Sequence, residues 1–481
     1  MNLKLIKLSF IVALSGGMIF TGCKDPVDPP PPPSTDAELS GSLNTMTLDA
    51  GKEYLIKGTV IVGDGVTLTI PAGTILKGEK KSKGTLVIAK GGKIMAEGTE
   101  QKPIIFTSNQ EPGEREQGDW GGLLILGKAN VNQNNPAIEG ISPAVNYGTF
   151  NSTANDNDNS GILKYVRIEY AGIALTPNNE TNSLTLGAVG SGTTIDYVQC
   201  TYGGDDSYEW FGGTVNCSHL ISLAAWDDDF DNDFGYSGKV QFALAIRDPF
   251  NADQSGSNGF EVDNDASGTT ATPKTACVYS NVTLLGPGFD SSKNNYSPNY
   301  GQALHLRRNC EISLFNSVFT GFPAGLNLDG TLANYTGGMG VLDKNILVIT
   351  GNAVKKTAAR PFMTGSSTST AVQDYFLTTK SNQVFTLHQP TAGTPAYSKA
   401  FADAGIPVEL IMGYNTTAGS TSGTYPANPN FASFGGATQS GAAFTDAKVS
   451  SWFTPTTFKG AFGSTDWTDN WSNFNPQLLP Y

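Results

Sequence analysis

Eight carboxylates lie within one short stretch of this chain, between Gly203 and Gly235. The stretch reads GGDDSYEWFGGTVNCSHLISLAAWDDDFDNDFG. Carboxylates at this density repel one another unless water or a cation lies between them. The stretch is therefore the candidate functional site. Its acidic residues are Asp205, Asp206, Glu209, Asp227, Asp228, Asp229, Asp231 and Asp233.

The second half of this stretch has the composition of a calcium site. In an extended backbone, alternate residues share one face. Ca²⁺ accepts six to eight oxygen ligands in flexible geometry, so it suits a row of carboxylates. The spacing is not that of an EF-hand, because the glycine comes one place late and the twelfth position is Val240 rather than Glu. We expect Ca²⁺ as cofactor, with carboxylates that cap turns or a catalytic cluster as alternatives. The expected metal ligands are Asp227, Asp229, Asp231 and Asp233.

Aromatic residues interleave with these acids and predict a second kind of contact. Aromatic rings beside acids on one rigid face can stack on sugar rings, while simple packing against the fold is the alternative. We expect this acidic-aromatic face to bind a ligand, either a glycan or an outer-membrane protein. The expected ligand-binding residues are Asp205, Asp206, Tyr208, Trp210 and Trp226.

The sequence gives less support to catalysis. A glycosidase needs two carboxylates, one with a raised pKa, and this stretch offers many. However, His305 stands in ALHLRR, without the Gly-His-Gly and Arg-x-Lys motifs of polygalacturonases. Arg247 and Arg307 are candidate bases for a calcium-dependent lyase, but pairing with nearby acids explains them as well. The sequence favours a non-catalytic binding or scaffold module, with a polysaccharide lyase or glycoside hydrolase, or a structural adhesin or surface-layer component, as alternatives.

Internal repeats predict the elements that position these residues. Strands of three to five residues alternate with glycine turns from Leu48 to Ser108. VQCTYGGDD (198–206) aligns with LISLAAWDD (220–228), VRIEYAG (166–172) aligns with VQCTYGG (198–204), and NVTLLG (281–286) aligns with NSVFTG (316–321). A coil of about 20–25 residues with insertions is typical of a solenoid. The prediction is an all-β parallel β-helix that leaves Asn281 and Asn316 at corresponding bends.

Several motifs resemble a family of exported Bacteroidota lipoproteins. They are GDGVTLTIPAGTILKG, IMAEGTEQKPIIFTS, GDWGGLLILG, GGDDSYEWFGGTVNC, DDDFDNDFGYSGKVQFALAIRDP and FKGAFGSTDWTDNW. The resemblance covers most of the chain after residue 45. It implies a right-handed single-stranded parallel β-helix and an exported address. It implies no activity, because the family has none that is settled.

The amino-terminal region predicts export and anchoring. Residues 1–22 read as a lipoprotein signal peptide with a short apolar core, and Cys23 as the lipidation site. Residues 23–44 are a proline-rich stalk, since five consecutive prolines favour extended polyproline II. We expect a lipid-anchored protein of the outer membrane, exposed at the cell surface. A net charge of −13 argues against nucleic acid as a partner.

The remaining segments complete the predicted organisation. Residues 45–355 form the β-helix, and residues 356–481 form less regular coils that end in an aromatic cap. A solenoid needs its open end covered, and we expect residues 458–471 to do this. The absence of any CxxC pair argues against zinc. Four cysteines are expected as small buried core residues: Cys200, Cys217, Cys277 and Cys310.

Overall fold

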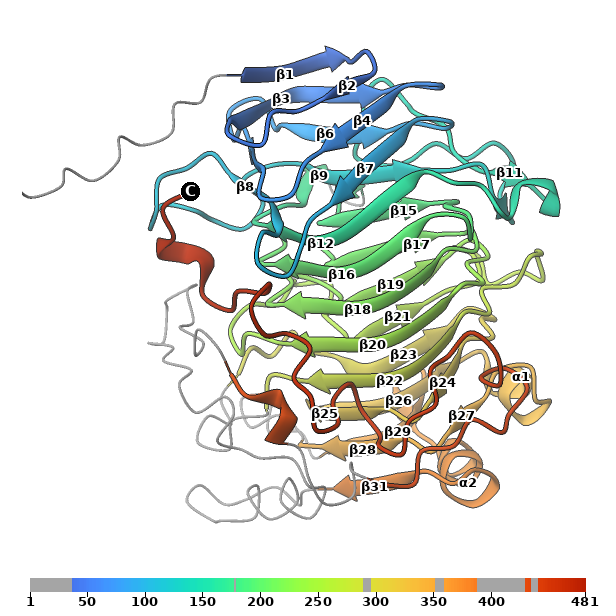
Figure 1. Ribbon diagram of the computed structural model, residues 1–481. Coiled ribbons are helices and arrows are strands. Elements are labelled where there is room, and N and C mark those ends of the chain that lie inside the picture. Colours follow the sequence, from blue (N-terminus) through green and yellow to red (C-terminus); the bar gives the residue numbers. More distant parts are fainter. Residues whose placement is uncertain (1–36, 177–178, 289–295, 351–358, 387–428, 434–439) are drawn as a thin grey trace, which may run out of the picture. The chain divides into compact units, whose positions relative to one another are not determined.

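The fold is a stack of coils that share one large, mostly parallel β-sheet. The computed structural model describes residues 37–176, 179–288, 296–350, 359–386, 429–433 and 440–481 (Figure 1). The described part contains a 27-stranded sheet in which almost every pairing is parallel and joins strands one coil apart. This is the parallel β-helix that the repeats predicted. None of the helices in the described residues has the length and apolar character needed to cross a membrane.

Each coil contributes strands to three ladders. The first ladder contains β2 (Met46–Thr47), β4 (Thr67–Ile70), β7 (Lys93–Glu97), the first halves of β12 (Gly161–Glu169), β16 (Thr194–Thr201), β18 (Asn216–Leu223), β20 (Lys239–Ile246) and β22 (Val278–Leu285), then β24 (Ser313–Phe315) and β27 (Leu342–Asp343). The second contains the first half of β3 (Glu53–Val62), β5 (Ile75–Gly78) and β8 (Ile104–Ser108). It continues with the second halves of β12, β16, β18, β20 and β22, followed by β25 (Val318–Phe322), β28 (Ile346–Ile349) and β31 (Gln383–Thr386).

The third ladder carries the candidate site, and we call its outer surface the site face. It contains the second half of β3, then β6 (Thr85–Ile88), β9 (Gly122–Leu126), β15 (Leu184–Gly187), β17 (Tyr208–Phe211), β19 (Phe230–Asp233), β21 (Phe260–Val262), β23 (Gln302–Arg307), β26 (Ala324–Asp329) and β29 (Arg360–Thr364). An edge strand, β1 (Ala37–Ser42), pairs along β3 at the first coil.

Smaller elements project from the stack. They are the strand pairs β10 (Asn130–Val131) with β11 (Thr149–Phe150) and β13 (Ile173–Thr176) with β14 (Asn179–Thr181), the two-residue β30 (Ser367–Thr368), and the short helices α1 (Leu332–Thr336) and α2 (Thr370–Asp374) with the turn η2 (Tyr375–Thr379). The helix α2 continues directly into η2, which has π-helical hydrogen bonding.

The core is a column of side chains that repeats from coil to coil. On the third ladder Tyr208, Phe230 and Phe260 are paired in register, fully buried, and packed ring against ring at 5.7 and 5.1 Å. Because side chains alternate along a strand, the next residue of each strand points outward. The outward column is Thr185, Glu209, Asp231, Glu261, His305 and Asn327.

The observed register agrees with the repeats read from the sequence. Val166 pairs with Val198, and Val198 pairs with Leu220. Val278 pairs with Ser313, which is the 35-residue shift that relates Asn281 to Asn316. Both asparagines adopt positive φ at a bend, as do Tyr165 and Tyr197 at the equivalent bends above them. The four cysteines after residue 37 are free and buried, as expected.

The structure corrects three predictions about the organisation of the chain. The β-helix does not end at residue 355, because β29 and β31 pair in parallel with β26 and β28. The expected stalk, 23–44, overlaps β1, which starts at Ala37 and pairs with β3, so its last residues belong to the solenoid. The expected end cap does not close the last coil. Residues 440–481, which we call the strap, run along the flank of the stack instead (Figure 1, red). They are held at Asn316 by Ala443, at Thr283 by Ala461, at Gln199 by Asn473 and at Lys77 by Tyr481.

Aromatic packing holds the strap against the coils. Tyr165, Tyr197 and His219 stack on one another at a shared bend, with centroids 4.4 and 4.1 Å apart. Trp471 meets the edges of this stack at 5.8 and 6.1 Å and is almost fully buried. The strap thus covers a stack of rings that lies outside the main core of the coils.

Removing the Trp471 side chain should loosen the strap. Truncation of a buried tryptophan to alanine costs about 3–5 kcal/mol. We expect Trp471→Ala to lower the free energy of unfolding in urea by that amount. The control is Trp452→Ala, because Trp452 lies on the same strap with 42% of its surface exposed and should change stability by about 0.5 kcal/mol or less. Equal effects of the two changes would contradict this role.

Candidate functional site

A hydrogen-bonded ladder of Asn and Asp residues positions the site at the entrance to the third ladder. The backbone N–H of Asp206 donates to Asn182 Oδ1 at 3.2 Å, and that of Asp228 donates to Asp206 Oδ1 at 2.7 Å. The N–H of Asn258 donates to Asp228 Oδ1, and that of Gln302 donates to Asn258 Oδ1 at 2.9 Å. Each side chain therefore fixes the start of the next coil, which satisfies buried backbone donors.

Two trios of carboxylates meet beside this ladder. The ligand atoms of Asp206, Glu209 and Asp231 lie within 4.8 Å of one another, and so do those of Asp228, Asp231 and Glu261. Asp231 belongs to both trios because it is central in the outward column, between Glu209 and Glu261. We call these five residues the acidic cluster. All their candidate ligand atoms are oxygens, which hard cations prefer.

Burial and mutual repulsion make four carboxyl groups of the cluster weaker acids than usual. Desolvation raises the pKa of Asp206, Glu209, Asp228 and Asp231 well above the usual value, and neighbouring carboxylates raise it further. Burial and then Glu180 raise the pKa of Glu139, on an overlying loop, to about 7. Within the described part of the chain, none of Asp206, Glu209, Asp228 and Asp231 has an ion pair with Lys or Arg.

The next coil supplies positive charge to one side of the cluster only. Arg307 pairs with both Glu261 and Asp263, and Arg308 pairs with Asp263 at 2.6 Å. His305 Nδ1 lies 3.4 Å from Glu261. These groups hold the pKa of Glu261 below its ordinary value despite burial. Negative charge is therefore compensated at Glu261 and Asp263 but not at Glu209 and Asp206.

The predicted row of four aspartates is only partly formed. The backbone becomes a strand at Phe230, so the alternation holds for Asp231 and Asp233, which lie on the site face. Asp229 points inward and pairs with Arg247 at 3.2 Å, both side chains being fully buried, and it accepts from Ser222 at 2.6 Å. Asp227 stays at the turn, near Ser255. Asp228 takes the place beside Asp231 that we had assigned to Asp229.

The predicted ligand platform is wrong for two of its aromatic residues. Tyr208 and Trp210 are 0% exposed and stack on each other in the core, because they occupy the inward positions of β17. Trp226 is half-buried at the turn and lines a pocket. Asp206 lies in the cluster, and Asp205 lies beside it, where burial and Asp227 raise its pKa.

The sequence also held signals that the predictions missed. Asn182 stands 24 residues before Asp206 and donates to Glu209 from the coil above. Asn258 occupies the same column 30 residues after Asp228. Recognising them requires knowing where insertions lengthen a coil. Glu139 belongs to the loop between β10 and β11, and no repeat predicts that this loop reaches Glu180 and Thr181.

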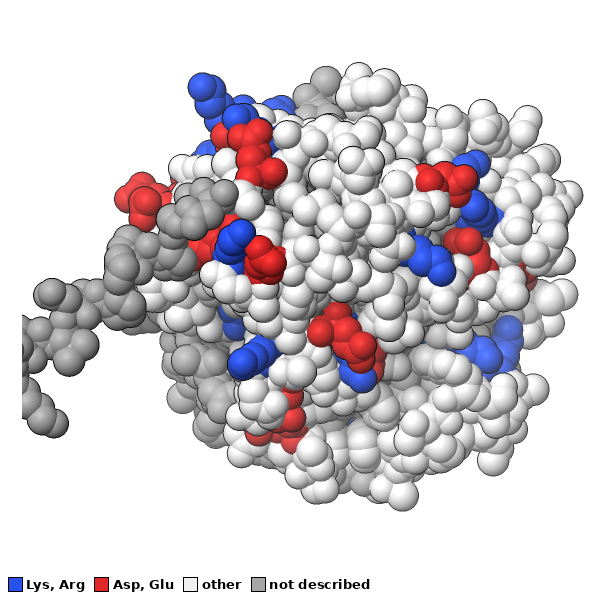
Figure 2. Space-filling view, turned by 45° about the horizontal axis from the view of Figure 1, so that its top comes forward, with Lys and Arg blue, Asp and Glu red and all other residues white. Residues whose placement is uncertain are grey.

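Charge elsewhere on the molecule is arranged differently. On the face shown in Figure 2, acidic and basic side chains lie close together among uncharged ones. Lys80 and Glu116 form an exposed ion pair at 2.8 Å. Exposed pairs of this kind contribute little to stability. The contrast shows that the unpaired acids of the cluster are a local feature and not the result of the overall charge.

Comparison with known proteins identifies the family. The model of a family described as a pectate-lyase-like β-helix domain matches residues 41–396. Because this match covers well over half of the chain, the protein belongs to that family. No curated protein and no solved structure matched the chain. The family description fits a polysaccharide-active scaffold, and it leaves the particular ligand and reaction open.

Breaking the internal ion pair should cost much more than breaking a surface pair. Arg247→Met leaves Asp229 charged, buried and unpaired, which typically costs about 3–5 kcal/mol. We expect this loss in urea unfolding, and partial recovery when Asp229→Asn is added. The control is Lys52→Met, since Lys52 and Asp49 form an exposed pair worth about 1 kcal/mol or less. A loss below that for Arg247→Met would contradict the assigned pairing.

The raised pKa values predict that, in the presence of a chelator, the folded protein becomes more stable as the pH falls. The carboxyl of Glu139 has a folded-state pKa of about 7 against an ordinary value of 4.5, so between these values the folded state binds more protons than the unfolded one. Stability from this group is complete below the lower value and is lost as pH rises through the higher one. In EDTA we expect the melting temperature to rise when pH falls from neutral to about 5. Glu139→Gln should reduce that rise, and a fall in the wild type would contradict the pKa shifts.

Proposed function

We propose that this protein is a calcium-dependent, non-catalytic glycan-binding module built on a β-helix. The observation that carries the proposal is the convergence of five carboxylates into two trios that share Asp231. Among the described residues, four of the five have no ion pair with Lys or Arg, and Glu261 pairs with Arg307. Oxygen ligands lie 2.3–2.6 Å from Ca²⁺, so pairs of ligand oxygens separated by up to about 5 Å fit around one ion. The trios meet this requirement. The ion would offset part of the negative charge of Asp206, Glu209, Asp228 and Asp231, which Arg307 and Arg308 do not pair.

The position of the cluster supports glycan binding rather than a purely structural ion. Asp231, Asp233 and Glu261 are only partly buried and belong to the site face, and Trp226 lies at the adjoining turn. Calcium with incomplete protein ligation can accept the oxygens of a sugar, and rigid strands hold the ligands in place. Membership of a pectate-lyase-like family agrees with a sugar-directed face.

Catalysis is a second candidate because Arg307 and His305 lie next to Glu261 at the edge of the cluster. The raised pKa of Asp231 also resembles that of a catalytic acid. Against this, Arg307 is engaged by two carboxylates and His305 lies between Glu261 and Asp329. Release of unsaturated uronates or reducing ends from a polysaccharide panel, abolished by Arg307→Ala, would establish the enzyme and refute the non-catalytic proposal.

The cellular location of the protein is part of the same proposal. We propose that acyl groups on Cys23 anchor the protein to the outer membrane and that the proline-rich segment holds the solenoid away from it at the cell surface. Cys23 and the prolines lie outside the described residues. The support is the sequence pattern alone. Mass spectrometry of the mature amino terminus, compared with that of Cys23→Ser, tests the anchor.

Calcium should raise the melting temperature of the EDTA-treated protein. A ligand that binds only the folded state adds about 2.7 kcal/mol at a concentration 100 times its Kd. Asp231→Asn should remove most of the increase, because it changes both trios. The control is Asp64→Asn, since Asp64 is exposed and pairs with Lys128 far from the cluster. An unchanged melting temperature with calcium, or an equal response in Asp231→Asn, would refute the metal site.

A further inference from the structure

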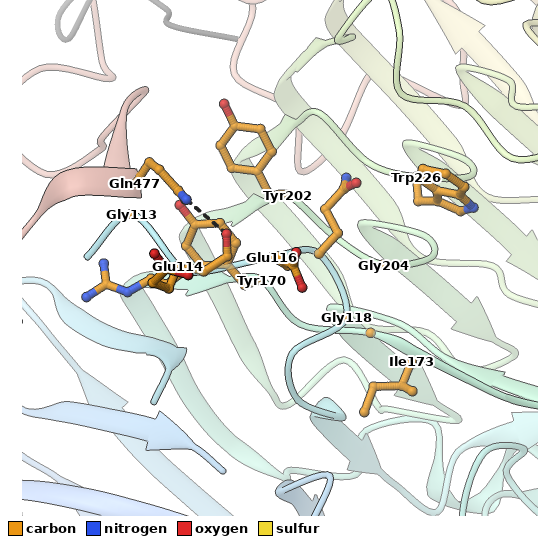
Figure 3. A pocket seen from close by; sticks show the side chains of 13 residues that line it. Gly113, Glu114, Glu116, Gly118, Tyr170, Ile173, Tyr202, Gly204, Trp226 and Gln477 are labelled. Carbon is orange, nitrogen blue, oxygen red and sulfur yellow. Dashed lines mark hydrogen bonds between the residues drawn. The ribbon is translucent and has the colours of Figure 1, made fainter. Parts of the chain in front are cut away.

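A pocket lies next to the acidic cluster, at the turn between the second and third ladders. Its volume is about 560 Å³, within the range of small-molecule sites, roughly 300–1,000 Å³. Four separate segments line it: the loop at 113–118, the turns at 170–173 and 202–204, and Trp226, with Gln477 of the strap at one edge (Figure 3).

Three glycines form a floor that no side chain can enter. A Cβ on Gly204 would lie 2.3 Å from the carbonyl oxygen of Gly172 and 2.6 Å from Cα of Gly118. The N–H of Gly204 donates to Ala171, and that of Gly172 donates to Trp120. Gly118 and Gly172 also have φ values of +73° and +93°, which side chains disfavour. The floor of the cavity is therefore formed by backbone and does not depend on a movable side chain.

The walls combine apolar surface with hydrogen-bond acceptors. Tyr202, Ile173 and Trp226 supply the apolar side (Figure 3). Glu114 and Glu116 supply carboxylates, and Gln117 supplies an amide oxygen, its Nε2 being occupied by the carbonyls of Gly203 and Ala224. Acceptors beside an apolar wall suit a ring that carries hydroxyl groups.

The basic groups near the pocket are already engaged. The guanidinium of Arg115 donates to the carbonyl oxygens of Gln110, Pro476 and Leu479. Lys80 pairs with Glu116 and Asp119. An anionic ligand would thus meet carboxylates without an available cation, which disfavours it. The lining therefore disfavours an anionic ligand, and its acceptors fit the hydroxyl groups of a neutral sugar.

The pocket and the acidic cluster are close along the backbone. Gly204 lines the pocket, and Asp206 belongs to the cluster two residues later; Trp226 and Asp228 repeat this relation in the next coil. Two residues of extended chain span roughly 7 Å. One glycan chain that bends around this turn would contact both the pocket and the acidic cluster.

We propose that this pocket is a subsite for a neutral hexose or pentose unit of the glycan whose neighbouring unit is held at the acidic cluster. The inference rests on the proposed glycan-binding function and adds the class of the second unit. It also implies that the pocket binds neutral sugar without calcium, because none of its lining residues belongs to the acidic cluster.

The test uses the full chain in EDTA and a panel of neutral trisaccharides of glucose, xylose and mannose, with a glucosamine trisaccharide as the cationic comparison. Binding is measured by saturation-transfer NMR and calorimetry. Ile173→Trp fills the pocket, and Ile173→Val is the matched control that leaves it open. We expect at least one neutral sugar to bind to the wild type and to Ile173→Val, and to bind at least tenfold more weakly to Ile173→Trp.

A second pair of variants covers the case in which Ile173→Trp folds poorly. Glu114→Ala removes an exposed acceptor from the pocket, whereas Glu111→Ala removes an exposed acid from the same loop outside it. We expect threefold or greater weakening from the first and none from the second. No binding of any neutral sugar, binding that neither pocket variant weakens, or pocket-dependent binding of the glucosamine sugar alone would each overturn the proposal.

The outcome is separable from that of the calcium site. If the pocket proposal fails while the proposed function holds, calcium still raises the melting temperature and Asp231→Asn still prevents this. If the calcium site fails while the pocket is correct, sugar binding remains sensitive to Ile173→Trp and calcium has no effect on stability.

Discussion

Vertical register is the constraint on which the rest of this structure depends. Each coil hydrogen-bonds to its neighbours through backbone ladders, and the Asn and Asp column extends this bonding into side chains at the turn before the third ladder. A side chain therefore has a fixed neighbour one coil away, whatever the length of chain between them. The intervals from Asp206 to Asp228 and from Asp228 to Asn258 differ, yet their hydrogen bonds are equivalent. The acidic cluster is a consequence of this register, since Glu209, Asp231 and Glu261 are brought together by strand pairing alone.

The same constraint explains what the sequence could predict. Coils without long insertions keep their spacing, so the pairing of Val198 with Leu220 and the approach of Asp206 to Asp228 follow from alignment. Whether a side chain points inward or outward is harder to predict, because it depends on the residue at which the strand begins. Asp229 precedes β19 and turns toward Arg247, and Tyr208 and Trp210 fall on the inward side of β17. Contacts made by insertions, such as that of Glu139, have no periodic signal.

Buried aspartates in neighbouring positions have two different kinds of partner. Asp229 and Arg247 form an ion pair inside the stack, and Arg247 also packs over the ring of Tyr300 at 5.1 Å. One side chain away, Asp228 and Asp206 remain without basic partners among the described residues. The fold can thus neutralise a buried acid when an arginine is placed in the adjoining coil. The acids of the cluster are different because a backbone amide, and not an arginine, binds the Oδ1 atom of Asp206 and of Asp228.

The strap has a consequence for how this fold can change over evolution. An open solenoid tolerates the gain or loss of a whole repeat, since each repeat touches only its neighbours. Here one continuous segment joins Asn316 to Lys77, and its contacts with Thr283 and Gln199 occur at fixed intervals along its length. Duplicating or deleting a coil between these points would put the strap out of step with everything beyond the change. The number of coils is therefore locked to the length of the tail, and the two can vary only together.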